Sequence, residues 1–132
     1  MPASNYVKQG SLNFWLKSAS VTQPSTLHVG LFTGDPGAGN LAGNEISGNG
    51  YARAALTVGN VSIVGDYAQV ANNAVVQFAA ATGSGGTPTF FGVFDAQTSG
   101  NLLFYGALPT TFAVTAGMEP KFNIGDLKIS AQ

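Results

Sequence analysis

Residues that often carry chemistry are scarce in this sequence. The chain of 132 residues contains no cysteine, so it forms neither disulfides nor thiolate metal sites. Its single histidine, His28, falls within an expected strand, and no G-x-S-x-G motif presents a nucleophilic serine beside it. The acidic residues are scattered and form no D-x-D-x-D-G calcium loop. These absences predict a protein with no catalytic residues, no cofactor and no metal site.

Charge is the second scarcity. Charged residues make up 8% of the chain, against roughly 25% in a typical soluble domain. Five basic and six acidic residues leave a net charge of −1, which argues against binding to nucleic acid through a basic patch. A nearly neutral surface is also poor at keeping copies apart. Two interpretations follow: partners cover much of the surface, or uncharged polar residues keep a free protein soluble.

Long apolar runs are missing as well. The N-terminus lacks the apolar region of a signal peptide, and no stretch approaches 18 uninterrupted apolar residues. The sequence therefore predicts no membrane partner and a protein that is made in a cytosol and is not exported by the general secretion route.

A phosphate-binding loop is the fourth absence, although the segment "HVGLFTGDPGAGN", residues 28–40, invites the comparison. A Walker-type loop needs a lysine and a serine or threonine followed by a helix. Here the glycines are followed by Asn40, Leu41 and more loop. The segment Asp35-Pro36-Gly37 instead has the composition of a turn, because proline fixes one φ angle and glycine supplies a positive φ beside it.

Residues 4–20 carry the only clear helical period. Ser4 or Asn5 suits the N-cap, and Pro24 lies beyond the end. One face of the expected helix is apolar through Leu12, Trp15, Leu16 and Ala19. We expect this face to close off the rest of the fold. Phe14 points elsewhere, so it is either a second core contact or an apolar plug into a neighbouring subunit.

After Pro24 the sequence favours short strands separated by Gly, Asn, Ser and Pro. A hairpin is expected over 90–108, linked by 97–100, and a one-residue slip at Gly125-Asp126 predicts a β-bulge. Gly92 and Gly106 inside the strands should bend the sheet or admit a close neighbour. The expected strands are 27–33, 51–58, 60–64, 74–80, 89–95, 101–108, 111–115 and 121–130.

These patterns predict a mainly β fold: an antiparallel β-sandwich, or a jelly-roll-like arrangement, with one N-terminal α-helix. Residues 1–132 are expected to form a single domain, with the helix over 4–20 and the β-sandwich over 25–132. No β-α-β alternation is present, which argues against a parallel sheet.

Glu45 and Arg53 bracket the loop "ISGNGYA" and are close enough in sequence to meet. One interpretation is a salt bridge that pins this loop, contributing under about 1 kcal/mol if it is exposed. The other is a bridge between subunits. Both interpretations stay open at the level of sequence.

Three segments, taken in order, resemble a family of small bacteriophage structural proteins that are labelled as tail-fibre or minor virion proteins. They are "TLHVGLFTGDPGAGN", "NEISGNGYARAAL" and "TFFGVFDAQTSGNLLFYGALP", and the resemblance extends from about Asn5 to Ile129. These are fold motifs without catalytic residues. The resemblance implies a non-enzymatic component of a virion, assembled in the host cytoplasm, and transfers no residue role.

Two functions are compatible with that resemblance. The first is a decoration or minor capsid protein that binds copies of itself, most simply as a trimer, and a neighbouring virion protein. The second is a tail-fibre or receptor-binding module that presents loops to a host surface and contacts glycan there. A separate alternative, from a different class, is a soluble carbohydrate-binding module that binds sugars on exposed aromatic rings, with Tyr51, Tyr67, Phe90 and Tyr105 as candidates. For the first, we expect an interface formed by the helix and the loop 34–50 with its flanks, through Phe14, Trp15, Asp35, Pro36, Glu45, Tyr51 and Arg53.

Overall fold

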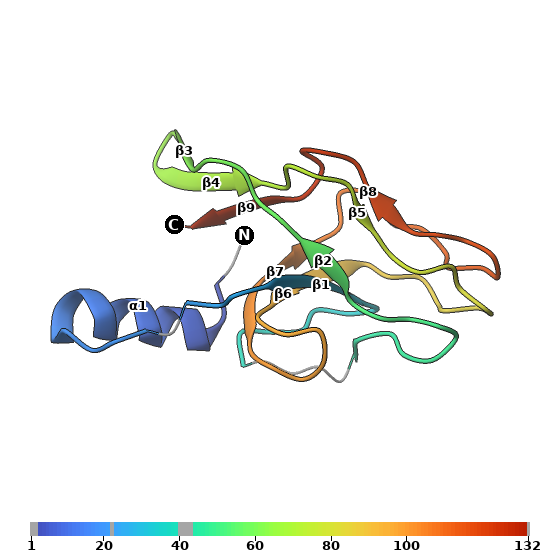
Figure 1. Ribbon diagram of the computed structural model, residues 1–132, viewed down its shortest axis with the longest axis horizontal. Coiled ribbons are helices and arrows are strands. Elements are labelled where there is room, and N and C mark those ends of the chain that lie inside the picture. The colour runs from blue at the N-terminus through green and yellow to red at the C-terminus, as the bar shows by residue number, and fades with distance from the viewer. Residues whose placement is uncertain (1–2, 22, 40–43, 132) are drawn as a thin grey trace.

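The computed structural model describes residues 3–21, 23–39 and 44–131 (Figure 1). One helix, α1 (Asn5–Lys17), precedes the strands in these ranges. The strands are β1 (Leu27–Phe32), β2 (Ala54–Leu56), β3 (Ser62–Val64), β4 (Tyr67–Ala71), β5 (Val76–Gln77), β6 (Phe90–Phe94), β7 (Leu102–Ala107), β8 (Lys121–Phe122) and β9 (Lys128–Ala131). The predicted fold class is confirmed: the described chain is mainly β with one helix near the N-terminus.

The strands form three antiparallel sheets. The largest has the order β2-β1-β6-β7, and the smaller ones have the orders β3-β4-β9 and β5-β8. The predicted hairpin is confirmed as β6–β7. Its register shifts between Val93 and Phe94, where a bulge or similar irregularity interrupts the pairing.

The main core lies on one face of the four-stranded sheet. Val29 and Leu31 of β1 and Val93 of β6 are almost fully buried there. They belong to one cluster with residues from the two small sheets, among them Val76, Phe122 and Ile129. A second cluster, made of Phe32, Phe94, Leu102 and Tyr105, holds buried rings from the same sheet. Strand β1 therefore contributes side chains to both clusters: Val29 and Leu31 to the first and Phe32 to the second.

Several strand predictions are wrong in extent. The predicted strand 111–115 is absent as a strand, and only Val114 forms an isolated bridge, to Gly86. The predicted strands 51–58 and 74–80 shrink to β2 and β5. Strand β4, over Tyr67–Ala71, was not predicted, because alanine and glutamine interrupt its apolar pattern.

The expected bulge at Gly125-Asp126 is also wrong, because the chain turns there. The backbone N–H of Asp126 donates to the carbonyl of Asn123 at 3.0 Å, and the Asp126 carboxylate accepts from the Asn123 N–H at 3.0 Å. Gly125 has a φ of 86°, which glycine adopts without strain. The predicted strand 121–130 is thereby divided into β8 and β9, which join different sheets.

Gly92 confirms the predicted close approach. A Cβ at this position would lie 2.8 Å from Leu102 Cδ1 and 2.9 Å from Phe32 Cε1. Both neighbours are fully buried and have little room to move. Gly92→Ala is therefore expected to lower the free energy of unfolding by about 1–3 kcal/mol through overpacking, measured by urea denaturation.

Gly39→Ala is the matched control for this substitution. A Cβ at Gly39 meets nothing within 4 Å, and its φ is not in the positive region. Its stability should stay within about 0.5 kcal/mol of the parent. Equal stabilities for the two variants would show that the β6–β7 packing relaxes freely around Gly92.

Candidate assembly surface

Helix α1 is fixed to the body at its first turn. Ser4 is fully buried, its side-chain oxygen accepts from the Val7 N–H at 3.3 Å, and it is the N-cap, as expected. The Ser4 N–H donates to the Leu103 carbonyl, and the Asn5 N–H donates to the Ala38 carbonyl, both at 2.8 Å. Backbone contacts to two distant segments therefore hold the start of the helix.

Beyond this first turn α1 extends away from the sheets as an arm (Figure 1). No residue of the helix is buried, and Leu12, Trp15 and Leu16 are 61%, 76% and 76% exposed. The expectation that this apolar face closes off the fold is therefore wrong. The period identifies which face is apolar, but it does not identify what covers that face.

Phe14 is exposed on the arm rather than packed in the core. Its side chain is 49% exposed, and its ring meets the Trp15 ring edge-on at a centroid distance of 5.2 Å. The core-contact interpretation of Phe14 is therefore wrong. The helix ends earlier than predicted, because Ser18 adopts the left-handed conformation with a φ of 55° and Ala19 donates to the Asn13 carbonyl.

A groove of about 770 Å³ lies where the arm, the segment that follows it and strand β7 meet. Val21, from the segment after the helix, would be 3.7 Å from a Cβ placed on Gly10, so this segment runs close along the arm. The groove lining includes Tyr6, Gly10, Phe14, Val21, Leu27 and Phe104. Val21 and Phe104 were not predicted as lining residues, because Val21 is an isolated apolar residue and the pattern that predicts the strand of Phe104 does not show that its side chain faces the helix.

Glu45 and Arg53 meet within the chain, as the loop-pinning interpretation predicts. Arg53 Nε and Nη2 donate to the two carboxylate oxygens of Glu45, each at 2.8 Å. Arg53 Nη1 donates to the carbonyls of Ala96 at 3.1 Å and Ser99 at 2.6 Å. The guanidinium also lies 3.5 Å from the centroid of the Phe94 ring. One side chain thus joins the loop before β2 to the β6–β7 turn.

The pair is largely buried, so the limit of about 1 kcal/mol for an exposed bridge does not apply to it. The side chains of Arg53 and Glu45 are only 6% and 13% exposed. The Tyr51 hydroxyl donates to Glu45 Oε2 at 2.7 Å and accepts from the Leu31 N–H at 3.1 Å. Burial, followed by the bond to Glu45, raises the pKa of Tyr51 above its usual value, which keeps the donating hydroxyl protonated.

Asp35 and Pro36 form the predicted turn. The Asp35 carboxylate accepts from the Gly37 N–H at 2.9 Å, and Gly37 has a φ of 72°. Pro36 is fully buried and Asp35 is exposed. Of the predicted interface residues, Phe14, Trp15 and Asp35 thus face outward, while Pro36 and Arg53 are buried within the chain.

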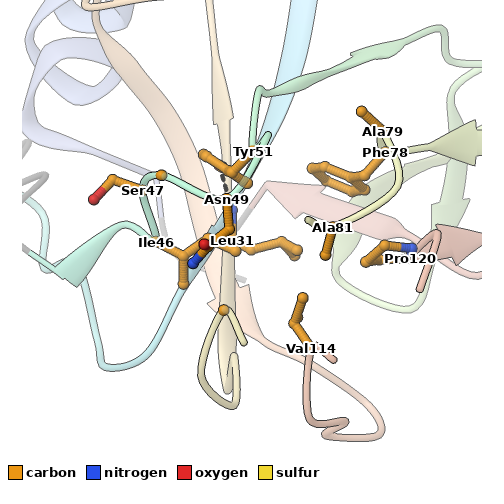
Figure 2. Close-up of a pocket in the computed structure, with 12 residues that line it drawn as sticks. Leu31, Ile46, Ser47, Asn49, Tyr51, Phe78, Ala79, Ala81, Val114 and Pro120 are labelled. Atoms are coloured by element: carbon orange, nitrogen blue, oxygen red, sulfur yellow. Dashed lines mark hydrogen bonds between the residues drawn. The ribbon is translucent and has the colours of Figure 1, made fainter. Parts of the chain in front are cut away.

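A second, much smaller cavity lies beside the Tyr51–Phe78 ring stack (Figure 2). Its volume is about 20 Å³, enough for roughly one water and far below the 300–1,000 Å³ of ligand pockets. Its lining comes from several loops and includes Ile46, Ala81, Val114 and Pro120. This cavity is a packing gap between aromatic and aliphatic side chains.

The aromatic residues proposed as sugar platforms differ in exposure. The hydroxyl and ring of Tyr51 are both engaged within the chain, and Tyr105 is only 9% exposed. Tyr67 and Phe90 are half-buried.

The described residues contain no group of three or more His, Cys, Asp or Glu side chains placed to hold a metal ion. Within the same ranges, no helix has both the length and the apolar character needed to cross a membrane.

Comparison with other proteins adds the family. No curated protein matches the chain. The model of one family, described as "Podophage GP4 fiber I protein gp80", matches residues 2–130, which is nearly the entire sequence. The match confirms the resemblance to small phage structural proteins that the three sequence segments indicated. The chain therefore belongs to this family of phage fibre proteins, which implies a component of a virion.

Proposed function

We propose that the protein is a non-enzymatic assembly component, assembled in the host cytoplasm and held in the virion through its helical arm. The observation that carries the proposal is that no residue of α1 is buried and that Leu12, Trp15 and Leu16 are all more than half exposed. A helix of 13 residues is marginally stable alone in water, and Gly10 weakens it further. A partner that covers the apolar side chains would stabilise both the helix and the contact.

The partners proposed are other copies of this chain, as a trimer, and a neighbouring virion protein. The low charge supports this proposal, because a net charge of −1 on 132 residues gives little repulsion between copies. The first candidate location is the capsid shell, where the protein would act as a decoration or minor capsid protein.

The second candidate is a fibre or receptor-binding module that contacts host glycan. The word "fiber" in the family description favours it. In this case Tyr67 and Phe90 supply the sugar platforms, because the rings of Tyr51 and Tyr105 are occupied inside the chain.

Phe14→Asp tests the arm. Placing a charge on this groove-lining residue should weaken self-association and incorporation into particles about tenfold or more. Light scattering of the purified protein and quantification of the variant in purified virions measure the two effects. Ile124→Asp is the matched control, because Ile124 is 65% exposed and lies outside the arm. Normal incorporation of Phe14→Asp would refute the role of the arm.

Mixing the protein with emptied capsids, with isolated tails and with host surface glycan separates the two locations. Sedimentation with capsids supports the decoration role. Retention on tails or glycan, without binding to capsids, supports the fibre role and refutes the decoration role.

A further inference from the structure

A second apolar surface, separate from the arm, lies on strand β3 and the residue before it. Val61, Ile63 and Val64 are 66%, 76% and 40% exposed, and every residue of β3 is exposed. Strand β3 is at the edge of its sheet, and the turn that links it to β4 carries Asp66. Edge strands usually carry charges or proline that discourage pairing with other chains, and residues 61–64 have neither. Val61 and Ile63 share one face of the strand, and Val64 lies on the other. We call Val61, Ile63 and Asp66 the hairpin patch.

The arm offers a matching set of side chains. Leu12, Trp15 and Leu16 are exposed, and Lys17 lies in the last turn of the helix. We call these four residues the arm patch. Figure 1 shows α1 and the β3–β4 hairpin at the same end of the long axis of the molecule. Each patch thus combines exposed apolar side chains with one charged residue, and the two charges are opposite.

The arm of one copy could bind either the arm or the body of another copy, and the charges favour the body. Helix α1 contains Lys8 and Lys17 and no acidic residue, so it carries +2. The rest of the chain has three basic and six acidic residues and therefore carries −3. Two arms side by side would repel each other, whereas an arm against the body of another copy brings opposite charges together.

We propose that the arm patch of one copy docks on the hairpin patch of a second copy, with Lys17 beside Asp66 of that copy. This inference rests on the self-association proposed above and names the surfaces that produce it. A contact between two different patches is heterologous, and it closes into a ring when the rotation between copies allows. The rotation between neighbouring copies sets the number of copies in the ring, and the trimer proposed above is one such closed ring.

Cysteine cross-linking tests the contact directly, because the chain has no cysteine of its own. Leu16→Cys protein mixed with Ile63→Cys protein should form a disulfide-linked heterodimer under mild oxidation, since a disulfide requires Cα atoms within about 7 Å. Leu16→Cys mixed with Ile124→Cys is the control and should not cross-link. The double variant L16C/I63C should give a covalent ladder that ends at the number of copies in the ring. A stronger cross-link of Leu16→Cys with itself would overturn the proposal in favour of arm–arm pairing.

Charge reversal gives an independent test. Lys17→Glu and Asp66→Lys should each weaken self-association about fivefold, which corresponds to one exposed ion pair, and the K17E/D66K double variant should restore it. Light scattering over a dilution series measures the shift. Failure of the double variant to recover, together with no L16C–I63C cross-link, would overturn this contact. The proposed function is tested separately. It stands if the parent protein is oligomeric and the Phe14→Asp variant is lost from virions, even when this contact is overturned. Normal incorporation of the Phe14→Asp variant would refute it.

Discussion

Arg53→Ala is expected to lower the free energy of unfolding by about 3–5 kcal/mol, measured by urea denaturation. The substitution leaves the Glu45 carboxylate, whose side chain is 13% exposed, without its cationic partner. It also removes the donor to the carbonyls of Ala96 and Ser99 and the cation above the Phe94 ring. Most of the expected loss comes from the unpaired Glu45 carboxylate, because little water reaches this side chain to solvate its charge.

Three companion variants separate the charge from the packing. Lys121→Ala removes an exposed cation and should change stability by no more than about 0.5 kcal/mol. The double variant E45A/R53A should lose less than the sum of its single substitutions, because it leaves no unpaired charge. Arg53→Lys keeps the charge but cannot bond both carboxylate oxygens, so an intermediate loss is expected. A loss below about 1 kcal/mol for Arg53→Ala would mean that the pair behaves as an ordinary surface bridge.

Asn72→Ala should have the second-largest effect, about 2–4 kcal/mol of unfolding free energy. The Asn72 side chain is almost fully buried and makes four hydrogen bonds. Its Nδ2 donates to the carbonyls of Ala74 and Asn123, both at 2.9 Å. Its Oδ1 accepts from the N–H groups of Gly125 at 3.1 Å and Leu127 at 3.0 Å. The substitution leaves the N–H of the buried Leu127 without its acceptor, which costs more than the bond itself contributes, and it removes three part-buried bonds.

The neighbouring residue supplies the control. Asn73 is exposed, and its side-chain oxygen accepts one hydrogen bond, from the Thr57 hydroxyl at 2.6 Å. Asn73→Ala should therefore lose no more than about 1 kcal/mol in the same denaturation experiment. Similar losses for both variants would show that the contacts of Asn72 are replaced by water.

The parts of the fold that local patterns encode were predicted well. Strand β1 and the β6–β7 hairpin follow from alternating apolar residues and a glycine-containing turn, and Ser4 caps the helix as expected. Strand β4 was missed because its pairing with β3 and β9, rather than its own composition, makes it a strand. The turn at Gly125 resembles a bulge in sequence because both use glycine to interrupt the same alternation.

In the candidate site, too, contacts between residues close in sequence were predicted, and contacts between distant residues were not. The Glu45–Arg53 pair was predicted because eight residues separate the two side chains, a distance that one loop closes. Its burial was not predicted, since it depends on Ala96 and Ser99, which lie more than forty residues further along the chain. The exposure of the arm was not predicted either, because the apolar period of α1 does not distinguish a core from a partner.

The pairing of β4 with β9 makes the hairpin patch depend on residues that are synthesised much later than the hairpin itself. Strand β4 is bordered by β3 and β9, and Asn72 after it bonds to Asn123 and Leu127. Until residues 121–131 leave the ribosome, the β3–β4 hairpin is a two-stranded ribbon, which is marginally stable alone in water. A chain released early would therefore carry the arm without a stable surface for the next copy.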